Sequence, residues 1–201
     1  MKPQVEMVKE YCTQLINETR CSVMPYHNLE HTMNVYNNVQ VIGQIEDLNV
    51  LEIEILRIAA LFHDTGFAET YFGHEEVSIR NAHQFLTEKK YPEEIIEKVV
   101  DCIRATKMPQ RPFSKLEKIM CDSDLFHLSS PDYILKSNFL KKELNLYLEL
   151  NITDEQWLEM NLNFLKQHKY CSHYGKTVLT DLKNRNIQKL EDLNRHYSNL
   201  D

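Results

Sequence analysis

Apolar residues recur at spacings of three and four along most of this chain, which is the period of an amphipathic helix. The first such segment runs from Pro3 to Thr19, and Pro3 suits its first turn. Its inward face would carry Val5, Val8, Tyr11, Cys12, Leu15 and Ile16. No run alternates between apolar and polar residues as a half-buried strand does, so the pattern predicts an all-α fold.

The later segments repeat this pattern, and several carry helix start and stop signals. A helix beginning near Tyr26 is expected to end at Gly43, and Asp47 or Asn49 can cap the next one. Further helices are expected from His74, from Pro92 to before Pro109, from Lys115 to about Leu128, from Pro131, from Thr153 and from Lys176 to Leu200. Capping-box spacing is present in Ser114 with Glu117 and in Thr153 with Gln156. The helix after Pro131 is expected to turn inward Ile134, Leu135, Phe139, Leu140, Leu144 and Leu148.

The composition favours one helical domain. The chain has 201 residues, of which 42% are hydrophobic, and this is enough for a single well-buried core. Because there are only four glycines and six prolines, few of the connections can be elaborate. We therefore expect a single-domain helical bundle over residues 1–201.

The charge and the cysteines limit the class of partner and the compartment. A formal net charge of −7 disfavours binding to duplex nucleic acid and to anionic membranes. The five cysteines form no CxxC pair, so they indicate reduced core thiols and neither a disulfide framework nor a zinc knuckle. The N-terminus has no apolar signal region, and no apolar run approaches the roughly 18 residues that span a bilayer. These features predict a cytoplasmic protein.

The stretch from Leu56 to Gly66, LRIAALFHDTG, is the centre of the chemistry. Its apolar run ends in His63 and Asp64, which places two metal-capable side chains at the edge of the core. Neighbouring residues on a helix point about 100° apart, so both can reach one ion only if it lies beyond the helix end. Gly66 is expected to supply that end as a left-handed cap.

Two other segments offer metal ligands. His27 and His31 are one turn apart on the expected helix and hence on one face, and Asp122 and Asp124 lie on a later helix. Imidazoles and carboxylates suit Zn²⁺, Mn²⁺, Fe²⁺ or, with waters, Mg²⁺. Residues i and i+2 project roughly 200° apart, so only one of the two aspartates can face a given ion. The other is expected to be a solvated carboxylate or a hydrogen-bond acceptor for a ligand imidazole.

In this order, the motifs YHNLEH (Tyr26 to His31), LFHDTG (Leu61 to Gly66) and CDSDL (Cys121 to Leu125) resemble the HD-domain superfamily of metal-dependent phosphohydrolases, which includes the cyclic-nucleotide phosphodiesterases. With GHEEVS and IRATK, the pattern is similar to small bacterial HD proteins predicted to be phosphohydrolases. The resemblance implies a single HD domain, with a metal-binding core at about 26–128 and C-terminal helices at 131–200 packing on it.

The resemblance also implies roles for individual residues. His31, His63, Asp64 and Asp124 become the ligands of a divalent cation (Mn, Mg, Zn, Fe or Ni), which makes Asp124 rather than Asp122 the ligand from CDSDL. His27 matches the histidine that protonates the leaving oxygen in the phosphodiesterase branch, although it can equally be a loop cap. His74 corresponds to a ligand of a second metal, and Asp64 or Glu75 would orient the attacking water. The IRATK segment lacks the further histidine of some two-metal members, which favours one tightly held ion.

A cationic stretch provides candidates for binding phosphate. Between Cys102 and Leu116 the chain has Arg104, Lys107, Arg111 and Lys115 and no acidic residue. Lys107 is the preferred phosphate ligand, with Arg104 and Arg111 secondary, because the stretch adjoins the helix that carries the aspartates. Cations at a helix end are also favoured by the helix dipole, so a structural role stays open.

The sequence thus predicts an enzyme that hydrolyses a phosphomonoester or phosphodiester, with a small phosphorylated substrate such as a nucleotide, and it is compatible with a homo-oligomer. Two alternatives stay open. One is a regulatory HD module that holds metal and nucleotide without turnover. The other is an HD-fold di-iron oxygenase, which requires more histidines than the motifs supply.

Overall fold

The computed structural model describes the backbone of residues 4–198 and the side chains of residues 5–195. Within these limits the chain is helical and contains no strand, which confirms the all-α prediction. Pro3, Leu200 and the side chain of His196 lie outside the described residues. The elements are α1 (Gln4–Glu18), η1 (Arg20–Val23), α2 (Leu29–Ile45), α3 (Val50–Phe62), η2 (Thr65–Ala68), α4 (His74–Glu88), α5 (Glu93–Ala105), α6 (Lys115–Asp124), η3 (Leu125–Ser129), α7 (Tyr133–Leu148), α8 (Asp154–Gln167), the π-helical turn η4 (Gly175–Leu179) and α9 (Thr180–Ser198).

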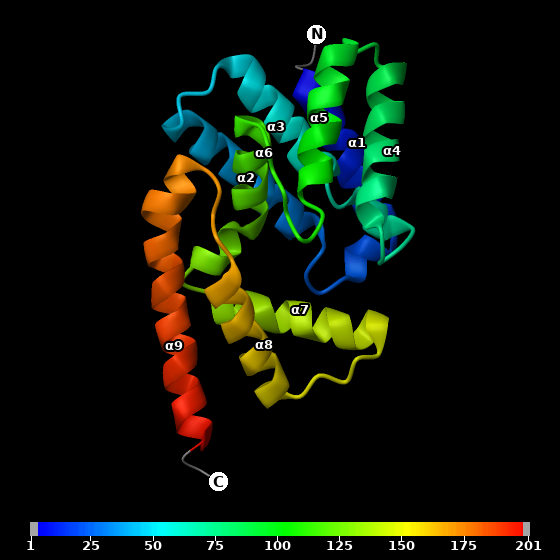
Figure 1. Ribbon diagram of the computed structural model, residues 1–201. Helices are drawn as coiled ribbons and strands as arrows, with labels where there is room; N and C mark the ends of the chain where they lie inside the picture. The colour runs from blue at the N-terminus through cyan, green and yellow to red at the C-terminus, as the bar shows by residue number, and fades with distance from the viewer. Residues whose placement is uncertain (1–3, 199–201) are drawn as a thin grey trace.

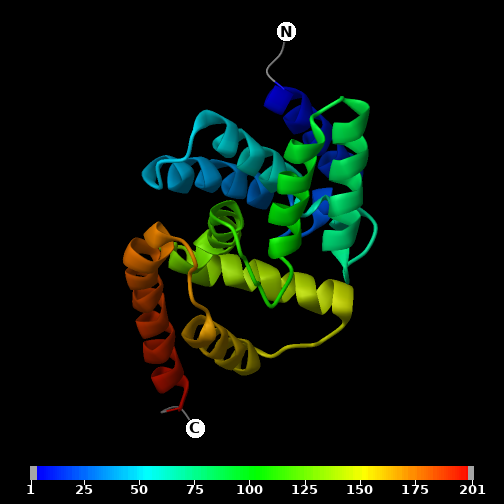
Figure 2. The same ribbon diagram turned by 45° about the horizontal axis from the view of Figure 1, so that its top comes forward.

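The first six α-helices form one packed group, and the last three lie along its lower side (Figure 1). α2 and α3 pack along one another, α5 contacts α3, α4 and α6, and α6 contacts α2, α3 and α5. Both views show α7 crossing beneath this group, with α8 and α9 beyond it (Figure 2). The core between the helices holds fully buried side chains such as Leu56, Phe62, Ile103 and Ile119. Because α3 is surrounded by other helices, its C-terminal end lies inside the molecule.

Side-chain caps set several helix starts. Asn28 accepts hydrogen bonds from the backbone N–H groups of Glu30 (2.9 Å) and His31 (3.3 Å), so α2 begins at Leu29. The prediction of a start near Tyr26 was therefore wrong by one turn. The predicted capping boxes of α6 and α8 are both present, and a third one at Asn49 and Glu52 starts α3.

Two glycines, Gly43 and Gly66, differ from expectation. Gly43 does not end α2, which continues to Ile45. Gly66 is not a left-handed cap, because it lies within η2, where an added Cβ would come within 1.9 Å of the His74 carbonyl oxygen. Gly66 is thus required by a close approach between η2 and the start of α4. The left-handed glycine is Gly73, with φ 71°, just before α4.

The inward face of α7 is rotated from the predicted one. Leu135 and Phe139 are 56% and 43% exposed, whereas the buried residues are Tyr133, Ser137 and Glu143. The apolar pattern misled here because two polar groups of α7 have buried partners: Glu143 accepts the backbone N–H groups of Tyr26 and His27, and the Tyr133 hydroxyl donates to Asn161. α6 also ends earlier than predicted, at Asp124, and continues as η3.

Candidate metal centre

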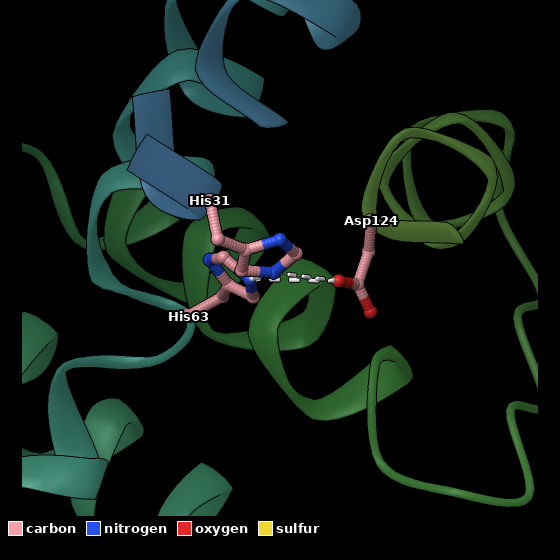
Figure 3. Close-up of side chains that lie close together, drawn as sticks. All are labelled: His31, His63 and Asp124. Atoms are coloured by element: carbon pink, nitrogen blue, oxygen red, sulfur yellow. Dashed lines mark hydrogen bonds and ion pairs between the residues drawn. The ribbon is translucent and has the colours of Figure 1, made fainter. Parts of the chain in front are cut away.

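Four side chains from three separate parts of the chain meet at the inner end of α3. His31 lies in the first turn of α2, His63 caps the C-terminus of α3 with Asp64 directly after it, and Asp124 is the last residue of α6. The Nε2 atoms of His31 and His63 are 3.3 Å apart. Asp124 Oδ1 lies 3.3 Å from His31 Nε2 and 3.6 Å from His63 Nε2, and it faces the two rings from across the site (Figure 3). Asp64 Oδ2 completes the cluster at 3.3 Å and 3.1 Å from the same two nitrogens.

The donor set fits a divalent cation. His31, His63 and Asp124 each offer an atom within 4.8 Å of the others, which is the spacing of ligands around one ion. Asp64 Oδ2 is buried and accepts no hydrogen bond, although two imidazole nitrogens lie close to it. A buried carboxylate oxygen without a donor is costly, and a cation between these atoms would remove that cost.

The ring of His63 is oriented for this purpose. Its Nδ1 donates to the carbonyl oxygen of Ala60 at 2.8 Å, which leaves the Nε2 lone pair directed at the cluster. Burial alone would lower the pKa of His63, but the carboxylates of Asp64 and Asp124 raise it well above its usual value. The pKa of Asp64, which burial alone would raise, is held well below its usual value by His63, His31 and His74. The cluster therefore strongly stabilises positive charge, and a metal cation would compete with protons for its ligand atoms.

His74 and Glu75 lie beside the cluster. His74 Nε2 is 3.5 Å from Asp64 Oδ1, the oxygen that does not face His31 and His63, and its Nδ1 lies 3.2 Å from the Tyr71 carbonyl oxygen. Glu75 is buried, with Oε2 3.8 Å from His74 Nδ1. Asp64 thus directs Oδ2 toward His31 and His63 and Oδ1 toward His74. His74 is therefore placed to bind a second ion that shares this carboxylate.

His27 precedes α2 instead of lying on it, so the expected shared helical face with His31 is absent. Its ring nevertheless lies 5.7 Å from that of His31. Its Nδ1 donates to Glu143 of α7, whose other oxygen accepts the backbone N–H groups of Tyr26 (2.8 Å) and His27 (2.9 Å). With Nδ1 fixed in this way, Nε2 is the His27 nitrogen that makes no hydrogen bond to the described residues.

Glu143 was missed by the sequence analysis. It is fully buried, and burial would raise its pKa, yet the hydrogen bonds from the side chain and backbone of His27 and from the Tyr26 backbone lower it. It also accepts from the Tyr71 hydroxyl at 3.1 Å. The available signal was an acidic residue three positions after Leu140, on the side of α7 expected to face inward.

Phe67 was also missed. Its ring stacks between those of His27 and His74, with centroid distances of 4.2 Å and 3.7 Å. Phe67 is in η2, directly after the HDTG stretch, and is 2% exposed. It therefore holds the two histidines apart at a fixed spacing beside the cluster.

Asp122 has a different position from either role considered for it. It is 1% exposed, and its two oxygens accept the backbone N–H groups of Cys171 and Ser172, each at 2.8 Å. An added Cβ at Gly175 would come within 2.1 Å of Asp122 Oδ2, so glycine is required there. Asp122 is therefore neither solvated nor a partner of a ligand imidazole, and it fixes the segment that leads into α9.

The cationic side chains gather elsewhere. Lys107, Arg104 and Arg111 border a separate cavity of about 560 Å³ around the Met108–Pro109 bond. Lys107 pairs with Glu76 at 3.2 Å, and Arg104 pairs with Asp101. Among the described residues, no hydrogen bond or ion pair joins these three cations to the cluster. This loop reaches the cluster through Gln110, whose Nε2 lies 3.4 Å from Asp124 Oδ2.

The remaining histidines and cysteines lie outside the cluster. His83 and His173 are exposed, and His168 caps the end of α8. All five cysteines are free thiols, four of them buried. Across the part of the chain that the structure describes, no helix combines the length and apolar character needed to cross a membrane.

Comparison with known proteins agrees with this geometry. The HD domain family matches residues 28–129, a segment that contains all four cluster residues and ends before α7. A predicted HD superfamily hydrolase from an uncultured Thermotogales bacterium, known from its crystal structure, has a similar fold. The TM-score is 0.66 at 15% sequence identity, over 97% of this chain and 94% of that one. No curated protein matches the chain.

Proposed function

The chain belongs to the HD-domain family, and we propose that it is a metal-dependent phosphohydrolase acting on a small phosphorylated substrate. The observation that carries the proposal is the convergence of His31, His63, Asp64 and Asp124, in which the Nε2 atoms of the two histidines lie 3.1 to 3.6 Å from a carboxylate oxygen of each aspartate. The family and the fold support a metal-dependent hydrolase in general. The phosphoester specificity is our inference from the donor set and from the position of His27.

The four cluster residues would hold the cation. When bound, a divalent cation supplies Lewis acidity, which activates water near neutral pH and polarises a phosphoryl oxygen. Asp64 presents its second oxygen toward His74 and is the carboxylate best placed to orient the attacking water, with Glu75 behind it. The mixed nitrogen and oxygen donors are compatible with Mn²⁺, Zn²⁺, Fe²⁺ or Ni²⁺, and with Mg²⁺ if waters complete the shell.

His27 would donate the proton to the leaving oxygen. Its Nδ1 is held by the buried carboxylate of Glu143, so the ring presents Nε2 near the cluster. A histidine oriented by a carboxylate is a common general acid, because the carboxylate fixes the tautomer and stabilises the imidazolium. Glu143 is thus a positioning residue contributed by α7, which lies outside the matched family segment.

The test begins with elemental analysis of the purified protein. Turnover of p-nitrophenyl phosphate, bis(p-nitrophenyl) phosphate and a nucleotide panel is then measured with added Mn²⁺, Mg²⁺ or Ni²⁺. The double variant His63→Ala/Asp64→Ala should lose the activity while its far-ultraviolet circular dichroism stays near that of the parent. The matched control is His83→Ala, which removes an exposed histidine and should change neither.

Undiminished turnover in the double variant would exclude the proposal. Bound metal together with thermal stabilisation by a nucleotide and no product would instead indicate a regulatory module. Two irons per chain with consumption of oxygen would indicate an oxygenase.

A further inference from the structure

The second carboxylate oxygen of Asp124 has no part in the function proposed above. Oδ1 faces the ring nitrogens of His31 and His63, and Oδ2 points away from both rings (Figure 3). Among the described residues, the side-chain amide of Gln110 donates to Oδ2, with Nε2 at 3.4 Å. The Asp124 side chain is only 17% exposed, so water has limited access to replace this donor. The orientation of this carboxylate therefore depends on a residue from outside the cluster.

Gln110 belongs to the connection between α5 and α6, and both ends of this connection are anchored. At the α5 end, the Thr106 hydroxyl donates to a carbonyl oxygen in the last turn of the helix at 2.8 Å. At the α6 end, the Glu117 carboxylate accepts the backbone N–H groups of Phe113 at 2.7 Å and Ser114 at 3.3 Å. The middle of the connection, which carries Gln110, is thus held in place from both sides.

Two prolines restrict the backbone around Gln110. Pro109 directly precedes it, and Pro112 follows two residues later. A proline ring fixes its own φ, and the residue before a proline is kept out of the helical region. The backbone that carries Gln110 therefore has few alternative conformations, and its amide needs little further ordering to donate to Asp124.

The cationic side chains of the same connection lie elsewhere. Lys107 pairs with Glu76, and Arg111 lines the separate cavity around the Met108–Pro109 bond, whereas Gln110 is not part of that lining. The connection thus presents a neutral donor to the cluster. A lysine or arginine in this position would repel a bound cation, but an amide donates a hydrogen bond without adding charge.

We propose that Gln110 is a positioning residue of the metal centre, which holds the Asp124 carboxylate with Oδ1 toward the cation and Oδ2 away from it. The proposal rests on the function proposed above only in taking the cluster to be a cation site. Without the amide donor, the carboxylate could rotate about its Cβ–Cγ bond and exchange its two oxygens. Binding a cation would then require ordering this ligand, which weakens the binding.

Cation binding measures this role without catalysis. We would titrate metal-free protein with Co²⁺ and follow the visible absorption of the bound ion, which reports both the affinity and the ligand geometry. Gln110→Met keeps the length of the side chain and removes the donor, so it should weaken Co²⁺ binding about 10- to 100-fold and change the spectrum. The matched control is Phe113→Met, which replaces a neutral, 87% exposed side chain of the same connection and should bind like the parent.

A double-variant cycle separates positioning of Asp124 from a general disturbance of the connection. In Asp124→Ala there is no carboxylate to orient, so the further change Gln110→Met should alter the remaining Co²⁺ affinity by less than about twofold. A loss as large as the one in the parent would mean that Gln110 acts independently of Asp124, and that result would overturn the proposal.

The same titrations distinguish this proposal from the enzymatic function. If the parent binds Co²⁺ but hydrolyses no phosphoester, and Gln110→Met still weakens the binding, the function fails and the role of Gln110 stands. Equal affinities and spectra in the parent and Gln110→Met would overturn the role of Gln110 whether or not the enzyme is active. A parent that binds no Co²⁺ would overturn both.

Discussion

α6 carries two aspartates near its end, the buried Asp122 and the partly exposed Asp124, and the partners of the two carboxylates differ in kind. Both oxygens of Asp122 accept backbone N–H groups, from Cys171 and Ser172. Asp124 faces two imidazole nitrogens and Asp64, whose Oδ2 accepts no hydrogen bond at all. A carboxylate whose two oxygens accept main-chain N–H groups stabilises the fold, whereas two carboxylates that converge on the same imidazole nitrogens form a site suited to a cation. The side of α6 that carries Asp122 thus stabilises the fold, and the side that carries Asp124, called the chemical side below, belongs to the candidate metal centre.

The largest expected effect is on the chemical side. Asp124→Asn should reduce kcat/KM on the order of 1,000-fold, because it removes a charged ligand of the cation. The free energy of unfolding should change by only about 1 kcal/mol or less, since Asp124 bears no main-chain hydrogen bond that fixes another segment. Metal titration and urea unfolding on the same sample would check both statements. If the free energy of unfolding of Asp124→Asn fell in proportion to its activity, Asp124 would also have a structural role. The distinction between the two aspartates would then be refuted.

The converse change is Asp122→Asn. The amide of asparagine can accept only one of the two backbone N–H groups, and its NH₂ would face the other, so we expect a loss of about 3 kcal/mol in the free energy of unfolding. Activity per folded molecule should stay near that of the parent, because Asp122 lies away from the cluster residues. Urea unfolding measures the first effect, and kcat at saturating metal measures the second. A specific loss of kcat in a fully folded variant would place Asp122 in the catalytic site.

The link between the C-terminal helices and the cluster is tested by Glu143→Gln. Loss of the carboxylate should lower kcat about 10- to 100-fold with little change in KM, because His27 loses the partner that orients its Nδ1–H. The effect should be largest for alkyl phosphates, whose leaving oxygen needs the proton, and small for p-nitrophenyl phosphate. A structural defect alone would slow both substrates equally, and that result would contradict the assigned role.

The smallest effect concerns pH and the region around α8 and α9. Burial and the nearby Lys183 lower the pKa of His168 to about 4, against an ordinary value of 6.5. As the pH falls below 6.5 the unfolded chain binds a proton at this residue before the folded chain does. Stability should therefore be lost progressively between about pH 6.5 and 4, by about 1–3 kcal/mol.

Replacement His168→Gln should flatten this part of the profile of unfolding free energy against pH. The exposed His173 provides the control, because His173→Gln should leave the slope unchanged. Equal slopes in all three proteins would mean that His168 is not the group responsible.

The features that depend on neighbouring residues could be read from the sequence alone. Helix periodicity and the capping boxes at Ser114 and Thr153 depend on short spacings. The grouping of His31, His63, Asp64 and Asp124 as candidates came instead from the resemblance of three short motifs to the HD-domain superfamily. Local hydrogen bonds and side-chain periodicity act within one or two turns, so they leave a pattern in the sequence.

Only the tertiary structure decided what joins distant segments. Glu143 lies 116 residues from His27, and Asp122 lies 49 residues from Cys171, so no spacing rule relates either pair. The same holds for the rotated face of α7 and for Gly66, whose constraint comes from the His74 carbonyl oxygen. In each case a buried polar group or a close backbone contact outweighed local preference, because an unsatisfied buried group or a steric overlap costs more than a shifted helix start or a rotated face.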